Sequence, residues 1–307
     1  MRAFASFILR GRPQAILVST AAAALALLLP LLSHISGGTI ALVTLYKGYV
    51  EGLLVLMATG VVLTGLGLVS DLSPALVTAF AISTILAAGV PVIIAAQVLR
   101  RSRDQGRALA VTAILAFLAM AGLQLAVEDP VAWWRRFLEA MLGSMLAQGP
   151  VPLTEADKAE IVESVALVMS GLMGAVLVYS TMINLFIGRW LQAIAFNPGG
   201  FRKEFHELRL GREAALAALG VMLLVTFSEG ELANFARNLL ILMVAVYSLH
   251  GLALVHGLVA ATNAHIAWLV VLYLMLLFLL PQTMILLSAA GFADSWVDFR
   301  ARFRRAS

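Results

Sequence analysis

The 307-residue chain contains no cysteine and few charged residues. The lack of cysteine excludes disulfides, thiolate-bound iron–sulfur clusters and thiol catalysis. Asp, Glu, Lys and Arg make up only 12% of the chain, whereas about 25% is usual in a soluble domain. So few charges cannot cover a water-facing surface, which argues against a soluble enzyme. A hydrophobic content of 62% argues equally against a disordered chain.

Recognisable enzyme motifs are also missing from the sequence. There is no P-loop, dinucleotide glycine fingerprint, zincin motif or nucleophile elbow. The net charge of +4 is too small to indicate nucleic-acid binding. We therefore predict no catalytic residue, no metal ligand, no cofactor and no nucleic-acid partner. An intramembrane enzyme acting on lipid-linked substrates is the weakest alternative, because the sequence shows no clustered acid–base set.

Long hydrophobic runs are what the sequence does contain. A helix needs about 20 apolar residues to cross a bilayer, and runs of that order recur along the chain. The pattern predicts an all-α fold, a polytopic transmembrane helix bundle of about eight spans with interfacial amphipathic helices. The single domain divides into N-terminal spans (13–128), an outer loop with an amphipathic helix (129–158), C-terminal spans (159–293) and a basic amphipathic tail (294–307).

The distribution of basic residues predicts the orientation in a bacterial inner membrane. Loops 100–107 and 189–212 are rich in arginine, which favours the cytoplasmic side. Segment 38–46 complicates this assignment, since it is too short for a normal crossing. Either it crosses as a short half-span, or the N-terminus and loop 100–107 lie on opposite faces. A fully crossing last span would likewise place the basic tail outside, unless a re-entrant segment or an interfacial helix intervenes.

Lys47 and Glu51 are the most informative charges within the hydrophobic part. They lie four residues apart, on one helical face, and charges at membrane depth often mark a ligand path. A snorkelling pair at the interface is the simpler alternative. We predict a cavity for a small solute between the helices. The ligand-binding candidates are Lys47, Glu51, Gln97, Asn184, His250 and His256, although interhelical hydrogen bonds would also explain the two histidines.

The segment 197–210 predicts an elbow on the cytoplasmic side. Pro198 and the glycine pair stop the preceding helix, and an amphipathic turn or two follows. Such an elbow could dock a membrane or cytoplasmic protein partner, or simply rest on lipid headgroups. The docking candidates are Asn197, Pro198, Gly199, Gly200, Phe201 and Phe205. Small residues at helix-packing spacing, such as Ser170 and Gly174, predict close helix contacts and would also permit a homo-oligomer.

Three stretches carry a family resemblance: RWLQAIAFNPGGFRKEFHELRL, ALVTLYKGYVEGLLVL and LLSAAGFADSWVDFRARFRR. With them, most of the chain resembles the YybS-like family of predicted bacterial membrane proteins. More loosely, it is similar to the S components of energy-coupling-factor vitamin transporters and to the cell-shape protein MreD. The YybS-like resemblance implies a membrane protein but no activity, because the family has none established. The irregular segment 38–47, the Lys47/Glu51 pair and the looser similarity to S components together favour a helix bundle that binds or transports a small solute in an S-component-like manner. The alternative is a non-catalytic scaffold or assembly factor that docks a partner through 197–210.

Overall fold

The computed structural model describes residues 1–70, 73–147 and 154–306, and these residues form helices joined by short links. The predicted all-α class is confirmed. Residues 148–153 of the expected outer loop and residue 307 of the expected tail lie outside the described residues. The helices are α1 (Arg2–Leu9), α2 (Arg12–Leu25), the 3₁₀ turn η1 (Pro30–Leu32), α3 (Ser33–Lys47), α4 (Tyr49–Leu68), α5 (Pro74–Ser83), the π-helix η2 (Thr84–Gly89), α6 (Val90–Ser102), α7 (Gln105–Ala126), α8 (Pro130–Ala147), α9 (Glu155–Phe196), α10 (Gly200–Glu207), α11 (Arg212–Phe227), α12 (Gly230–Ala261), α13 (Ala267–Phe278), α14 (Leu280–Val297) and α15 (Phe299–Ala306).

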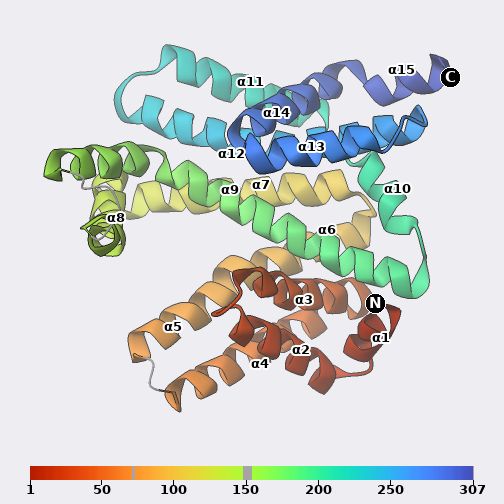
Figure 1. The fold of residues 1–307 in the computed structure, drawn as a ribbon, viewed down its shortest axis with the longest axis horizontal. Helices are drawn as coiled ribbons and strands as arrows, with labels where there is room; N and C mark the ends of the chain where they lie inside the picture. The colour runs from red at the N-terminus through yellow and green to blue at the C-terminus, as the bar shows by residue number, and fades with distance from the viewer. Residues whose placement is uncertain (71–72, 148–153, 307) are drawn as a thin grey trace.

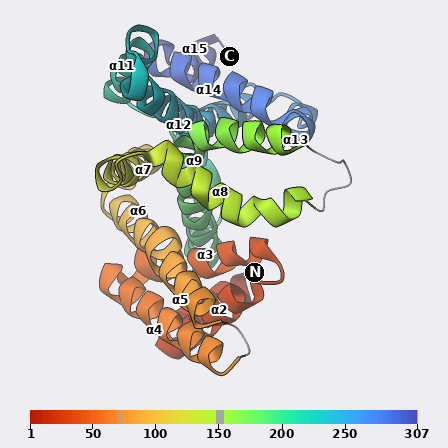
Figure 2. The ribbon, with the colours of Figure 1, turned by 90° about the vertical axis from the view of Figure 1, so that its left-hand side faces the viewer.

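The helices form two groups on either side of α7 and α9 (Figure 1). Helices α1 to α6 make one group and α11 to α15 the other, and the second view shows the same order (Figure 2). Helix α9 contacts α3 of the first group and α12 of the second. The largest buried cluster includes Leu109 of α7, Met182 and Leu185 of α9, and Leu242 of α12. The two groups are therefore held together by the central pair α7 and α9.

Helix α9 is 42 residues long because its start is capped and nothing interrupts it before Asn197-Pro198. The Thr154 hydroxyl accepts a hydrogen bond from the Asp157 amide, and the Asp157 carboxylate accepts one from the Thr154 amide. At 1.5 Å per residue the helix is about 63 Å long, about twice the thickness of the hydrocarbon core of a bilayer. Its first turns pack against α8, where Trp134 and Leu138 meet Val162.

Among the described residues, four helices are long and apolar enough to cross a membrane, namely α4, α7, α9 and α12. The bent pair α10–α11, with an angle of 48°, makes a fifth candidate if it counts as one span. Several other expected spans are shorter or interrupted. Helix α2 ends at Leu25, although the hydrophobic run extends to Leu32. Between α5 and α6 the chain forms the π-helix η2, and α6 has Pro91 in its first turn.

Basic segments from distant parts of the chain meet at one end of the bundle, here called the basic end (Figure 1). Arg12, at the start of α2, donates from Nε to Glu51 Oε2 at 2.8 Å, in the first turn of α4. Lys47 and Arg100 line one cavity, and Arg100 and Arg189 line another. The ends of α3, α6 and α9 therefore lie near the starts of α2 and α4.

Helix α3 explains how the N-terminus and loop 100–107 reach the same end. The ambiguous segment 38–46 belongs to a regular helix of 15 residues, Ser33–Lys47, which lies against α2 and α9. Gly188 of α9 allows this approach, because a Cβ there would collide with the Ala41 side chain and the Leu42 amide nitrogen. The chain thus returns along α3 to the end where α2 began.

The C-terminal helix also lies at the basic end. Helices α13 and α14 form a hairpin whose break falls next to Pro281, which cannot donate to the helix hydrogen bonds and so favours a break here. Beyond the hairpin, Arg209 Nη1 donates to Asp298 Oδ2 at 2.9 Å. Arg300 Nη2 donates to the Leu208 carbonyl oxygen at 2.9 Å. These bonds hold α15 against the link between α10 and α11.

Candidate functional site: cavities at the basic end

Two cavities of about 440 Å³ each meet at Arg100. The first lies between the ends of α3, α6 and α9 and the start of α10, and its walls include Arg100, Arg103, Arg189 and Glu204. The second lies between the α3–α4 link and α6, and its walls include Lys47 together with Gln97, Arg100 and Arg101. Both volumes fall within the range of about 300–1,000 Å³ that is usual for ligand sites.

Local backbone geometry brings these cations together. Gly48, with φ of 105°, ends α3 and begins α4, and a Cβ at this position would press against Arg100 Nη1 at 2.7 Å. Arg103 ends α6 in the left-handed region, with φ of 54°. Asp104 then caps α7 by accepting from the amides of Gly106 and Arg107. The two sharp turns after α3 and α6 place their terminal basic residues around one space.

The charge around Arg100 is strongly positive. Within the described part of the chain, Lys47, Arg100, Arg101 and Arg103 form no ion pair with an acidic side chain. The one acid in the walls of either cavity is Glu204, and its carboxylate is bound by Arg189, with Nε–Oε2 at 2.8 Å. Uncompensated cations in a walled space attract anions. The arrangement therefore fits a small anionic group.

Of the six ligand-binding candidates, Lys47 and Gln97 lie together in the walls of one Arg100 cavity. Gln97 Oε1 is buried and has no hydrogen-bond partner among the described residues. Glu51 does not pair with Lys47. Its carboxylate is held by Arg12, from Nε at 2.8 Å and from Nη2 at 2.6 Å. Asn184 lies elsewhere, buried between α9 and α3, where its Oδ1 is 2.8 Å from His34 Nδ1.

The two histidines of α12 have separate surroundings, as their spacing of six residues predicts. His250 is fully buried, and its Nε2 is 3.1 Å from Asp294 Oδ2 of α14. His256 is half-buried, and its Nε2 is 2.9 Å from the Tyr273 hydroxyl of α13. Both contacts are interhelical hydrogen bonds, the simpler of the two roles expected for them. His256 also lines a cavity between α9, α10, α12 and α13.

The 197–210 elbow has its apolar residues turned inward. Gly199, with φ of 84°, starts α10 in a conformation that favours glycine. The Phe201 and Phe205 rings contact Phe186 of α9, with centroids 5.8 and 5.4 Å apart. Both line a larger cavity of about 680 Å³ between α9, α10, α12 and α13, here called the aromatic cavity. Asn197 instead lines the first Arg100 cavity, beside Glu204.

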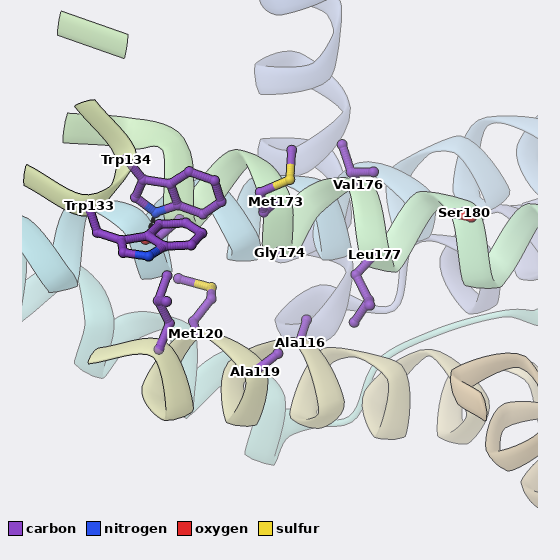
Figure 3. A pocket seen from close by; sticks show the side chains of 12 residues that line it. Ala116, Ala119, Met120, Trp133, Trp134, Met173, Gly174, Val176, Leu177 and Ser180 are labelled. Atoms are coloured by element: carbon purple, nitrogen blue, oxygen red, sulfur yellow. Dashed lines mark hydrogen bonds between the residues drawn. The ribbon is translucent and has the colours of Figure 1, made fainter. Parts of the chain in front are cut away.

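A further cavity of about 370 Å³ lies between α7, α8 and α9 (Figure 3). Trp133 and Trp134 lie at one end of it, and Leu177 and Val176 extend along α9 toward Ser180. Trp134 Nε1 donates to Ser170 Oγ at 2.8 Å, so α8 is fastened to α9 here. The expected amphipathic helix is present as Pro130–Ala147, but Trp134 packs against α9 and does not face the membrane interface. Without a charged wall, this cavity suits no polar solute.

Sequence reasoning missed several of the cavity residues. Arg100, Arg101 and Arg103 were interpreted only as orientation signals, because a linear sequence does not show that two of its turns face each other. Asp294 and Tyr273, the partners of the α12 histidines, were not singled out. An aspartate after a 62-residue stretch (232–293) without any other acid is a signal that points to Asp294.

No three His, Asp or Glu side chains gather to hold a metal within residues 1–70, 73–147 and 154–306. No family model matches the chain, and no curated protein or solved structure is similar to it. Helix length and composition indicate a polytopic membrane protein. Any further statement about function therefore depends on the cavities themselves.

Proposed function

We propose that the chain is a polytopic protein of the bacterial inner membrane that binds a small anionic solute at its basic end. The observation that carries the proposal is the cluster of four unpaired cations around the two cavities that share Arg100. The looser similarity to S components agrees with solute binding but does not identify the solute, and the YybS-like resemblance carries no activity.

Eight crossings account for the path of the chain. The crossing segments are α2, α3, α4, α5–α6, α7, α9, α11 and α12, and the α13–α14 hairpin is re-entrant. This path leaves both termini and both arginine-rich loops at the basic end, which the positive-inside rule assigns to the cytoplasm. Acidic residues such as Glu128, Asp129 and Glu229 then fall on the outer side. The solute site opens toward the cytoplasm.

Guanidinium groups favour carboxylate or phosphate groups, because their planar donors match two oxygens at once. Arg100 is the residue that both cavities share, so it is the strongest candidate for the primary contact. Lys47 and Gln97 on one side, and Arg103 on the other, complete the shell. The stacked rings of Tyr46 and Phe196, with centroids 5.0 Å apart, close the wall between α3 and α9.

The scaffold alternative has less support from the structure. A docking elbow needs apolar residues that face outward, whereas Phe201 and Phe205 contact Phe186 inside the molecule. The exposed side chains of α10 include Arg202 and Lys203. A partner would therefore have to bind a charged, water-exposed helix surface.

A thermal-shift assay on the purified protein tests the proposal, with inorganic phosphate, pyrophosphate and citrate as probes. A ligand that binds only the folded state raises its stability in proportion to RT ln(1 + [L]/Kd). We expect at least one probe to stabilise the wild type and the Arg136→Ala variant, whose exposed arginine lies on α8. Arg100→Ala should abolish the shift. Equal shifts in wild type and Arg100→Ala, or no shift with any probe, would contradict solute binding at this site.

A further inference from the structure

The aromatic cavity is larger than either of the two Arg100 cavities, and the solute site does not use it. Its lining follows helical spacing on each wall: Tyr179, Ile183 and Phe186 on α9, and Leu249, Leu252 and His256 on α12. From Leu249 to Ala260 the α12 wall covers 12 residues, a rise of about 16 Å. The cavity therefore extends along α12 for three turns.

Its polar groups divide between the two ends. At the inner end the Tyr179 hydroxyl is bonded to Ser248 Oγ at 2.7 Å, so it offers little to a ligand. At the basic end stand Arg202 and His206 of α10. Between these ends the wall consists mainly of aliphatic and aromatic side chains. No acidic residue lines the cavity, and Arg202 forms no ion pair within the described part of the chain.

One side of the cavity reaches the outer surface of the bundle. Ile266 and Tyr273, which line it beside α13, are 66% and 50% exposed. In a membrane this surface faces lipid. A molecule could thus enter laterally from the bilayer and place a polar end at α10, where the helices reach the water.

We propose that the aromatic cavity binds one anionic lipid, with its phosphate at Arg202 and one acyl chain along α12 toward Tyr179. Charge complementarity identifies the headgroup, since the mouth carries a cation without an acidic partner. The apolar walls and their length of about 16 Å fit a hydrocarbon chain and do not fit a compact solute. The chain packs against the apolar walls, and the contact between phosphate and Arg202 sets the preference for an anionic headgroup.

This site is separate from the solute site, although both adjoin α10. Glu204 of α10 faces Arg189 and the Arg100 cavity, whereas Arg202 and Phe205 face the aromatic cavity. The lipid site therefore does not depend on solute binding, and either proposal can fail alone.

Native mass spectrometry of the delipidated, full-length protein tests the lipid site. The probes are phosphatidylglycerol, phosphatidylcholine with the same chains, and glycerol 3-phosphate as the headgroup alone. We expect one phosphatidylglycerol to bind the wild type at least about tenfold more tightly than phosphatidylcholine, as one charge-assisted contact allows. Glycerol 3-phosphate should not compete, because it lacks the chain.

Two variants locate the site. Arg202→Gln removes an exposed charge and should erase the preference for phosphatidylglycerol, while Arg212→Gln, an exposed arginine at the start of α11, should keep it. Leu252→Trp fills the cavity and should abolish binding of both lipids. Arg100→Ala should leave lipid binding unchanged. An unaltered preference in Arg202→Gln, or effective competition by glycerol 3-phosphate, would overturn the proposal.

Discussion

His250 Nε2 lies 3.1 Å from Asp294 Oδ2, and neither side chain is more than 1% exposed. This contact joins α12 to α14. The other oxygen of the same carboxylate, Oδ1, accepts the Phe299 amide at 2.9 Å and so caps α15. Arg300 approaches Oδ2 at 3.9 Å. A single carboxylate therefore connects α12, α14 and α15 and holds α15 in its place.

Removing this carboxylate should destabilise the protein strongly. Asp294→Ala leaves the buried His250 ring, the Phe299 amide and the Arg300 guanidinium without their common acceptor. Loss of one partner of a buried charged pair costs about 3–5 kcal/mol. We expect a large fall in the melting temperature in detergent and faster proteolysis of α15.

The neighbouring Ser295→Ala variant serves as the control. Ser295 is half-buried, and its hydroxyl donates to the Gly291 carbonyl oxygen over a long 3.4 Å. Its loss should change the melting temperature little. If both variants have the same melting temperature, Asp294 does not connect the three helices in the way proposed.

Helices α12 and α14 approach closely through glycine. A Cβ at Gly251 would overlap the Leu287 carbonyl oxygen, and backbone cannot move aside without separating the helices. Gly251→Ala should therefore destabilise the protein by about 1–3 kcal/mol or more, as overpacking does. Thermal unfolding in detergent measures the loss.

Gly220→Ala on α11 gives the matched comparison. A Cβ at Gly220 meets nothing within 4 Å, so only helix propensity changes. Alanine is preferred to glycine in a helix interior by about 0.8–1.0 kcal/mol, so this variant should melt at the same or a higher temperature. A neutral Gly251→Ala would mean that α12 and α14 pack less tightly than described.

The sequence predicted the helical class and the breaks with a local cause. Pro281 ends α13, and the Thr154–Asp157 pair starts α9, because proline and capping groups act within one turn. Hydropathy described the shorter helices less well. Residues 14–32 form one continuous hydrophobic run, yet α2 ends at Leu25, because hydrophobicity does not specify where a helix turns back.

Residue partnerships were the least predictable feature. Lys47 and Glu51 share a helical face only if one helix continues through Gly48, and the chain instead turns there, with φ of 105°. Glu51 then pairs with Arg12, 39 residues away. Such a pairing depends on the tertiary arrangement of α2 and α4, which no local pattern encodes.

We expect the stabilising contact between Asp298 and Arg209, which holds α15, to depend on pH. Burial disfavours its charged form, but hydrogen bonds from Arg209 and the Ala301 amide outweigh this and hold its pKa below the ordinary value. Because the pKa of Asp298 is lower in the folded state, its ionised form stabilises the fold at pH values above its unfolded pKa of about 3.9. This stabilisation is lost as the pH falls through the folded pKa.

The Asp298→Asn variant measures this contribution. Asparagine tolerates the left-handed backbone of this position, φ of 48°, and can still accept the Ala301 amide. At pH 7 the variant should have a lower melting temperature than the wild type. The loss in free energy of unfolding should be at most about 1 kcal/mol, because the ion pair is exposed. The difference in stability should persist down to about pH 4 and then shrink as the pH falls further, through the lowered pKa of Asp298. A constant difference across this range would exclude the ionised Asp298 as its cause.

The proposed topology predicts which positions face the cytoplasm. Because the chain has no cysteine, single cysteines can be introduced without a background signal. The positions chosen are all exposed: Arg10, Arg101, Arg212 and Arg302 at the basic end, and Glu128 and Glu229 at the other. In intact cells a membrane-impermeant maleimide should label only the cysteines at 128 and 229, and lysis should expose the other four. Labelling of position 302 in intact cells would show that α13–α14 crosses the bilayer completely. Labelling of position 10 in intact cells would show that the N-terminus lies outside.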